Sequence, residues 1–315
     1  MLVTGATGFV GRPTVAALAG EGFEVHALSS RLEPPAVAGV QWHRADLRSD
    51  LEVDALLADL APEQLLHMAW EVQPGRFWDA PENLLWVERS LHLVRAFAVA
   101  GGRRAVLLGT CAEYDWSRAR APLEELTSPL TPSTLYGVAK DALRRVLTAY
   151  AEQVGFELAW GRLFFLYGPR EAPGRLVSSL ITSLLAGEPV ATTAGAQRRD
   201  FMHVDDVAGG IAALLASGVT GPVNLASGVA RTVAEVVDQI ALATGRGELI
   251  ERGALADRPG EPALLVADTT RLRDEVGFTQ RIDLADGIAD AVEWWRAQSS
   301  EGPPAAATKA ERADR

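Results

Sequence analysis

The chain has 315 residues and a formal net charge of -11, and its 48% hydrophobic and 23% charged residues are typical of a soluble globular protein. This acidic balance argues against a nucleic-acid partner, and the single cysteine, Cys111, excludes a disulfide framework and a cysteine-based zinc site, so we expect no metal. No run of eighteen apolar residues and no signal peptide are present, so we expect a cytoplasmic protein without a membrane partner.

A short strand at residues 1–4 leads into a glycine-rich turn and a helix at 14–20. Gly5, Gly8 and Gly11 are spaced as G-x-x-G-x-x-G, which lets backbone N–H groups approach a pyrophosphate at the start of a helix. A second strand at 24–28 completes a βαβ pattern. This context favours a dinucleotide site over an ordinary turn between a strand and a helix.

The second strand is followed by Ser29, Ser30 and Arg31. Dinucleotide folds usually have an acidic residue here, which accepts hydrogen bonds from the adenosine ribose. Two hydroxyls and a guanidinium would instead hold a 2′-phosphate, with Arg12 as a second cation. The pattern therefore favours NADP(H) over NAD(H), and the alternative is an exposed loop arginine.

Further strands at 40–43, 64–69, 104–108 and 156–163 alternate with helical patterns, which predicts a doubly wound parallel sheet of the Rossmann α/β type. Asp46 either accepts a hydrogen bond from the adenine amino group or caps the helix that follows. We interpret His67 as a packed histidine.

The domain organisation follows from where this alternation stops. We expect a dinucleotide-binding domain at residues 1–165, rejoined by about 203–227, and a smaller C-terminal α/β substrate-binding domain at 166–296. Residues 297–315 have no periodicity and are expected to be a disordered tail.

Three side chains are candidates for the chemistry. Tyr136 and Lys140 are four residues apart at the start of a predicted helix, so they share one face. An ammonium there would favour phenolate and lower the pKa of Tyr136 toward the range of a general acid/base. Thr110 follows the fifth strand, where catalytic hydroxyls in such sheets tend to lie. We expect the three to converge on one carbonyl or carbinol.

Together these features resemble the extended short-chain dehydrogenase/reductases, in particular the NAD(P)-dependent sugar-nucleotide epimerase/dehydratase/reductase group. The resemblance runs in family order from residue 1 to about 296. The matching motifs are TGATGFVG (4–11), ADL (45–47), HMA (67–69), T-x-x-x-Y (110–114), YGVAK (136–140), RLFFLYGP (162–169), RDFMHVDDVA (199–208) and VADTTRLRDEVGF (266–278).

The resemblance implies roles for individual residues. Tyr136 would be the acid/base, Lys140 would hold the ribose hydroxyls and tune Tyr136, and Thr110 would hydrogen-bond the reacting oxygen. The implied coenzyme contacts, beside Tyr136 and Lys140, are Gly5, Thr7, Gly8, Phe9, Val10, Gly11, Ser29, Ser30, Arg31, Asp46, Leu47, Met68 and Ala69.

The resemblance also implies a nucleotide-diphosphate sugar as substrate, whose diphosphate is held by Arg199 and Arg258. The alternative for Arg199 is a salt bridge to Asp200 or Asp205. The remaining expected substrate contacts are Thr110, Glu113 and Phe165. Helices at 84–100 and 133–154 resemble those that form a dimer interface in this group, so we expect a homodimer.

Departures from the group narrow the function. The 4,6-dehydratases have an acidic pair directly after the catalytic Thr, whereas this chain has Cys111 and Ala112, and Glu113 comes one residue late. The Cys and His pair of the 3,5-epimerising GDP-fucose synthases is also missing, since Arg170 follows the YGP motif. Phe165 and Trp86 stand where the group often has Asn.

We therefore predict an NADPH-dependent reductase of a nucleotide-linked keto sugar, most plausibly an NDP-4-keto-6-deoxyhexose 4-ketoreductase. The first alternative is an NAD-dependent NDP-sugar 4-epimerase. The others are a reductase of a carbonyl compound without a nucleotide and a non-catalytic dinucleotide sensor.

Overall fold

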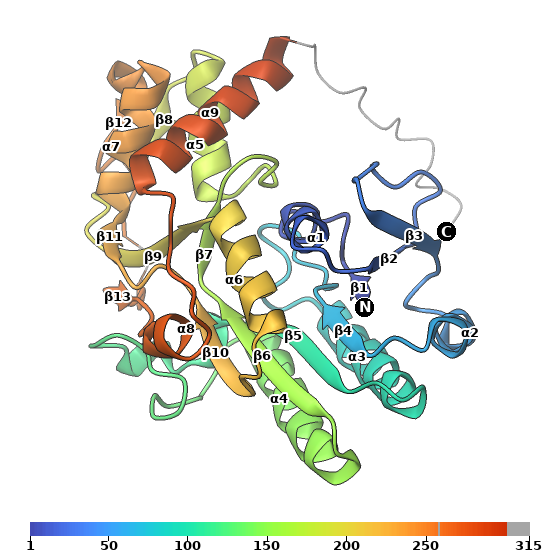
Figure 1. Cartoon of the computed structure of the whole chain (residues 1–315). Helices are drawn as coiled ribbons and strands as arrows, with labels where there is room; N and C mark the ends of the chain where they lie inside the picture. The colour runs from blue at the N-terminus through green and yellow to red at the C-terminus, as the bar shows by residue number, and fades with distance from the viewer. Residues whose placement is uncertain (258, 301–315) are drawn as a thin grey trace.

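A computed structural model describes residues 1–257 and 259–300, and its centre is a seven-stranded parallel sheet (Figure 1). In sheet order the strands are β10 (Gly221–Leu225), β6 (Glu157–Leu163), β5 (Arg104–Thr110), β4 (Gln64–His67), β1 (Leu2–Thr4), β2 (Val25–Ser29) and β3 (Val40–Arg44). Every neighbouring pair is parallel. Each strand that the sequence predicted for the dinucleotide-binding part is present, so the predicted fold class is confirmed.

Helices cover both faces of this sheet. The helices are α1 (Gly11–Gly20) and α6 (Val204–Ala216) on one face, and α2 (Asp50–Leu60), α3 (Glu82–Val99) and α4 (Leu135–Val154) on the other. Because successive strand residues point to opposite faces, Leu2 packs with Leu93 and Leu147 whereas Val3 packs with Ile211. Both faces of the sheet are therefore buried, as in other doubly wound folds.

Strand β10 and helix α6 return to the sheet from the second half of the sequence. Arg104 on β5 fixes this return, because its buried guanidinium donates to the backbone oxygens of Leu214, Leu215 and Val219. These carbonyls lie at and just after the end of α6, where a helix leaves acceptors unpaired.

The smaller C-terminal part contains short strands, the short helix α8 and three longer helices, of which α5 and α9 lie beside α7 in Figure 1. The strands are β7 (Phe165–Tyr167), β8 (Val190–Ala191), β9 (Arg198–His203), β11 (Ala230–Thr232), β12 (Ile250–Glu251) and β13 (Leu264–Leu265); the helices are α5 (Leu176–Leu185), α7 (Val233–Thr244), α8 (Thr270–Asp274) and α9 (Leu284–Ser300). Ile181, Val236 and Ile288 form the core between α5, α7 and α9. This part is α/β, as predicted.

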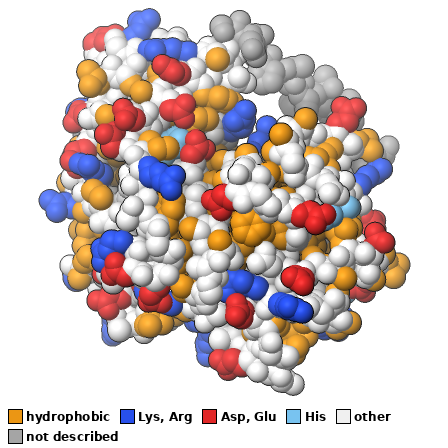
Figure 2. All heavy atoms as spheres, viewed as in Figure 1, with side chains coloured by type: hydrophobic (Ala, Val, Ile, Leu, Met, Phe, Trp, Pro, Cys, Tyr) orange, Lys and Arg blue, Asp and Glu red, His pale blue; other side chains and the backbone are white. Residues whose placement is uncertain are grey.

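Helix α9 extends to Ser300, so the prediction of a structureless tail from residue 297 is wrong for residues 297–300. Residues 301–315 of that predicted tail lie outside the described residues. No helix between residues 1 and 300, residue 258 aside, combines the length and apolarity needed to cross a membrane. On the face drawn in Figure 2, acidic and basic side chains are interspersed instead of forming one basic surface.

Candidate functional site

The glycine-rich turn between β1 and α1 has no room for side chains at two positions. Gly5 has a φ of 71°, and a Cβ there would lie 2.7 Å from the backbone of Met68 and Ala69. A Cβ on Gly11 would lie 2.1 Å from the carbonyl oxygen of Gly5. Glycine therefore lets this turn contact the end of β4 closely.

Helix α1 begins at Gly11 without a side-chain cap, which leaves a helix start suited to an anionic ligand. The N–H of Gly8 closes the turn by donating to Gly5 at 3.0 Å. Thr7, Phe9 and Val10 lie in the same turn, next to the start of the helix. A pyrophosphate contact from this turn stays a prediction.

At the end of β2, Ser29 is buried and its Oγ accepts the backbone N–H of Arg31 at 3.1 Å. The side chains of Ser30 and Arg31 are exposed. The strand end is thus polar and cationic, and it has no carboxylate for the adenosine ribose.

Two other arginines belong to this region. Burial lowers the pKa of Arg12, and the charges of Arg170 and Arg31 lower it further, so the three guanidiniums repel one another. None of them forms an ion pair with a carboxylate in residues 1–257 or 259–300. Arg170, which directly follows the YGP motif and has a φ of 67°, was not foreseen from the sequence as part of this group.

Asp46 does not cap a helix. Its carboxylate accepts hydrogen bonds from the guanidinium and backbone N–H of Arg48, which lowers the pKa of Asp46. Ser49 is the N-cap of α2, since its Oγ accepts from Glu52, so the capping alternative is wrong. The adenine contact stays a prediction, while the neighbouring Leu47 is buried in the core.

His67 is a packed histidine, as we interpreted it. Its ring nitrogens hydrogen-bond the hydroxyls of Thr4, at 2.7 Å, and Ser90, at 2.8 Å. Burial lowers the pKa of His67 to about 3, so the ring is neutral. It ties β1 and β4 to α3 just before Met68 and Ala69.

Thr110 and Tyr136 lie close together because a glycine lets the elements that carry them approach each other. Thr110 ends β5 and caps the short helix η1 (Cys111–Glu113), while Tyr136 lies in the first turn of α4. A Cβ on Gly137 would lie 2.4 Å from the carbonyl oxygen of Ala112, so only glycine permits this approach of α4 to η1. The Thr110 hydroxyl is near enough to the Tyr136 phenol to act on its pKa.

The ionisation of this pair differs from the sequence-based expectation. Burial raises the pKa of Tyr136, and the Thr110 hydroxyl and the charge of Arg175 only partly oppose that rise. The pKa is therefore raised by burial, and the predicted lowering by Lys140 is wrong for this structure. The Lys140 Nζ donates to the Leu108 carbonyl at 2.8 Å, and burial lowers the pKa of Lys140 to about 7.

Aromatic side chains surround Tyr136. Trp70, Phe77 and Trp78 belong to residues 70–78, which we call the aromatic loop, and their ring centroids lie 6.3, 5.0 and 6.0 Å from that of Tyr136. Trp116 packs against Trp78. The apolar surroundings of Tyr136 are thus provided largely by the aromatic loop.

Asn83 is a site-forming residue that sequence reasoning missed. Its buried side-chain oxygen accepts from Trp70 Nε1 at 2.9 Å, and its nitrogen donates to the carbonyls of Phe77 and Ala80. It therefore holds both ends of the aromatic loop. Trp86, three residues later, packs against Trp70 and the core.

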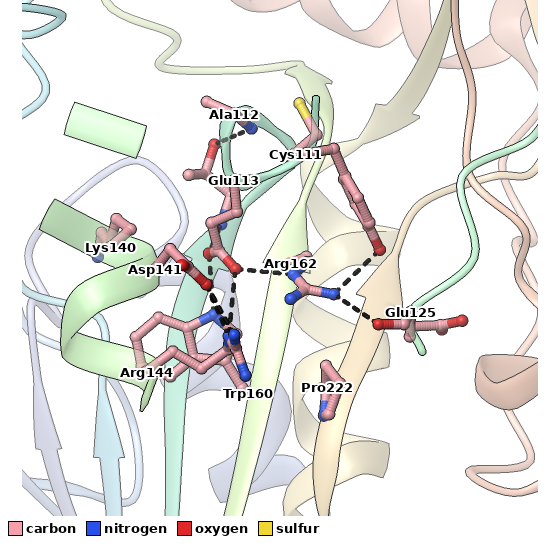
Figure 3. A network of polar contacts seen from close by, with 12 residues as sticks. Cys111, Ala112, Glu113, Glu125, Lys140, Asp141, Arg144, Trp160, Arg162 and Pro222 are labelled. Atoms are coloured by element: carbon pink, nitrogen blue, oxygen red, sulfur yellow. Dashed lines mark hydrogen bonds and ion pairs between the residues drawn. The ribbon is translucent and has the colours of Figure 1, made fainter. Parts of the chain in front are cut away.

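Glu113 lies beneath the site and is fully buried (Figure 3). Its Oε1 accepts from the Thr110 N–H and from Trp160 Nε1, both at 2.9 Å, and its Oε2 accepts from Arg162 Nε at 2.7 Å. Both oxygens are used by the protein. The structure therefore places Glu113 in support of Thr110, not in contact with a substrate as predicted.

Gly109 makes the room for this network. A Cβ there would lie 2.0 Å from Trp160 Nε1 and 2.3 Å from Glu113 Oε1. Arg162 Nη1 extends the network to the Tyr114 hydroxyl and the Glu125 carbonyl, each at 3.1 Å. The backbone that presents Thr110 is thus fixed from below by a buried ion pair.

The two residues after Thr110 offer no acid. Cys111 is buried, and this burial raises the pKa of its thiol to about 12. Ala112 packs with Phe77 and Tyr136. Cys111 is therefore a small packed residue.

Arg199, expected to bind a diphosphate, pairs with a carboxylate. Its Nη2 lies 2.7 Å from Glu261 Oε1, its Nη1 donates to the carbonyls of Arg198 and Pro262, and its guanidinium lies 5.6 Å from the Phe165 ring centre. The proposed salt bridge to Asp200 or Asp205 is therefore wrong.

Asp200 instead accepts from the backbone N–H groups of Ser227, Gly228 and Ala267. Substrate contacts by Arg199 and Phe165 stay predictions. Arg258, the second expected diphosphate ligand, lies outside the described residues.

One group of side chains has the spacing of a metal site, although none was expected. Ligand atoms of His203, Asp205 and Asp290 all lie within 4.8 Å of one another. The His203 ring also serves the fold, because its Nδ1 accepts the N–H of Asp205 at the start of α6.

The fold, the glycine turn and the buried Thr110 and Tyr136 pair define a dinucleotide-dependent oxidoreductase of the doubly wound α/β class. The model of the NAD dependent epimerase/dehydratase family matches residues 1–226. The chain belongs to this family, and with it to the extended short-chain dehydrogenase/reductases.

Relatives support this assignment over the full chain. The chain is 28% identical to the dTDP-glucose 4,6-dehydratase of Streptomyces griseus, with 96% of both chains covered, and 29% identical to the UDP-glucose 4-epimerase of Mycolicibacterium smegmatis, with 95% and 99% covered. The solved structure of MoeE5 in complex with UDP-glucuronic acid and NAD is 32% identical, covers 94% and 99%, and superposes with a TM-score of 0.78.

Proposed function

We propose that this protein is an NADPH-dependent reductase of a nucleotide-diphosphate-linked sugar, with a 4-keto-6-deoxyhexose as the substrate class. The relatives act on, or are bound to, nucleotide sugars, which supports a substrate of that kind. The chemistry of the Thr110 and Tyr136 pair supports a carbonyl or carbinol as the reacting group.

The observation that carries the proposal is that, in the part of the chain that the structure describes, no free carboxyl group stands in the positions directly after Thr110. A 4,6-elimination needs a proton donor and a proton acceptor besides the tyrosine. The positions after Thr110 are a buried thiol and an alanine, and Glu113 is held by Arg162 and Trp160. Hydride transfer coupled to one proton needs only the tyrosine.

Tyr136 suits the reducing direction because burial raises its pKa, so the phenol carries its proton at neutral pH. When bound, the reduced nicotinamide supplies hydride to the carbonyl carbon. Tyr136 then gives its proton to the oxygen that becomes the new hydroxyl, while Thr110 hydrogen-bonds to that site. The aromatic loop excludes water there and favours a methyl over a hydroxymethyl group.

Arg12, Arg31 and Arg170 support NADP(H) as the coenzyme. Three neighbouring cations without a carboxylate partner among the described residues would suit an extra phosphate in an acidic protein. The alternative is NAD(H), which is bound to MoeE5 and to a 26% identical UDP-glucose 4-epimerase from Thermus thermophilus.

The test is NADPH oxidation in the presence of a panel of dTDP-, GDP-, CDP- and UDP-4-keto-6-deoxysugars. We expect stoichiometric formation of NADP⁺ and the reduced sugar with one member of the panel. A protein that oxidises neither NADPH nor NADH with any of them would exclude the reductase.

The second candidate is a nucleotide-sugar 4-epimerase, and the full-length similarity to such an enzyme favours it. An epimerase would purify with tightly bound NAD and would interconvert UDP-glucose and UDP-galactose without added coenzyme. A reductase would exchange its coenzyme freely. Coenzyme content after denaturation therefore separates the two candidates.

A further inference from the structure

The segment that joins the YGP motif to α5 crosses to the aromatic loop. Arg175, at the N-cap position of α5, has its guanidinium carbon 5.2 Å from the Phe77 ring centre and donates to the Val72 carbonyl at 3.4 Å. A Cβ on Gly174 would lie 3.5 Å from Pro74. One residue of the C-terminal part therefore contacts the aromatic loop near its start, at Val72, and near its end, at Phe77.

A buried carboxylate fixes this segment. Glu171 Oε2 accepts the N–H of Ser178 at 2.9 Å, and Ser178 Oγ donates to the Ala172 carbonyl at 2.8 Å. Burial raises the pKa of Glu171 to about 7. The Arg175 side chain has no acceptor and cannot cap α5, so Glu171 accepts from the first turn in its place. The Arg175 guanidinium is directed to the aromatic loop instead.

The aromatic loop in turn holds Tyr136. The Phe77 ring packs edge-on against the Tyr136 ring at 5.0 Å, and the Trp78 carbonyl accepts the backbone N–H of Tyr136 at 2.9 Å. The charge of Arg175 also opposes the rise in the pKa of Tyr136. Arg175 thus acts on the Tyr136 phenol in two ways, by its contacts with the aromatic loop and by its charge.

We propose that Arg175 is a positioning residue, which holds the aromatic loop against Tyr136 and so fixes the orientation of the phenol for proton transfer. The expected effect of Arg175 on turnover rests on the proposed function. The contact between Arg175 and the aromatic loop is independent of that function, so the contact and the effect on turnover are tested in separate experiments.

The first experiment uses the protein alone and measures hydrogen exchange of a peptide covering residues 70–80. We expect about tenfold faster exchange in R175A, because the loop loses its outer contact, and exchange close to wild type in R175K. R76M is the matched control, since Arg76 is an exposed guanidinium on the same loop. Equal exchange in R175A and wild type would overturn the proposal, whatever the activity.

The second experiment measures steady-state kinetics of R175M, R175K and R76M with the substrate identified by the panel. We expect kcat of R175M to fall about 10- to 100-fold with little change in the KM for coenzyme, since misplacing a reacting group costs rate more than binding. R175K should recover part of the loss, and R76M should match wild type. A wild-type kcat in R175M, or an equal loss in R76M, would overturn the positioning role. An inactive wild-type protein would instead count against the proposed function and leave the exchange result decisive.

Discussion

The ammonium nitrogen of Lys140 lies 3.7 Å from the centroid of the Trp70 ring and donates to the Leu108 carbonyl. An ammonium over an aromatic face is attracted to it, but this contact and one hydrogen bond replace a full hydration shell. Burial consequently lowers the pKa of Lys140 to about 7. The cost of keeping this charge in the fold leads to the first prediction.

We expect Lys140→Met to abolish turnover and yet to stabilise the protein below about pH 7. The pKa of Lys140 falls from 10.5 to about 7 on folding, so between these values only the unfolded chain binds the proton. The stability of the wild type therefore rises with pH in this window, whereas below it the full cost of the buried charge remains.

The stability that the Met variant gains over wild type should shrink as pH rises from about 7 to about 10. Thermal unfolding of both proteins across this range measures it. A Met variant that is less stable than wild type at about pH 6 would contradict the prediction.

Tyr136→Phe tests the proton donor. The substitution keeps the ring packing against Phe77 and Trp70 but removes the hydroxyl. We expect kcat to fall about 10²- to 10⁴-fold. Tyr150→Phe is the control on the same helix, because the Tyr150 ring packs against Phe156, away from Tyr136. Equal turnover in Tyr136→Phe and wild type would exclude Tyr136 as the acid.

The sequence predicted the sheet because its strands are apolar runs separated by helical periodicity and glycine turns. Gly5 and Gly11 lie in the turn between the first strand and helix, where close backbone contacts leave no room for a Cβ. The expected lowering of the Tyr136 pKa by Lys140 was wrong. Their spacing on a helix predicts a shared face, but it does not predict how deeply the two side chains are buried.

The supporting contacts of the site could not be predicted from local patterns. Glu113 and Arg162 are 49 residues apart in the sequence, and Arg199 meets a carboxylate 62 residues away. Such partners depend on how strands and loops pack. For the same reason, sequence reasoning assigned Glu113 to the substrate and missed Asn83.

Glu113→Gln should destabilise the protein strongly. The change keeps the shape of the side chain but leaves the Arg162 guanidinium buried without its charge partner, and Arg162 Nη2 already has no hydrogen-bond partner. Breaking a buried ion pair in this way costs about 3–5 kcal/mol. We expect that loss in the free energy of unfolding by urea denaturation.

Glu157→Gln is the control for this change. Glu157 pairs with Arg104, but its side chain is 56% exposed, so we expect a loss of no more than about 1 kcal/mol. Similar losses in the two variants would show that the Glu113 network does not depend on the buried charge.

The homodimer expected from the sequence stays a prediction, and the outer surfaces of α3 and α4 favour it. Val146 on α4 is 53% exposed and Leu84 on α3 is 62% exposed. We expect light scattering to give a dimer for the wild type and a monomer for Val146→Asp, since a charge in an apolar interface opposes association. Folding should be unaffected because Val146 is outside the core, and a monomeric wild type would refute the prediction.

Arg31→Ala tests the choice of coenzyme. If the 2′-phosphate lies between Arg31 and Arg12, removing the Arg31 guanidinium should raise the KM for NADPH about 10- to 100-fold. The KM for NADH should stay nearly unchanged, because only NADPH has this phosphate. The effect should weaken with added salt, since Arg31 is exposed. Arg48→Ala is the control, because this exposed arginine is paired with Asp46. A parallel rise in both KM values, or a wild type that prefers NADH, would favour NAD(H) and with it the epimerase.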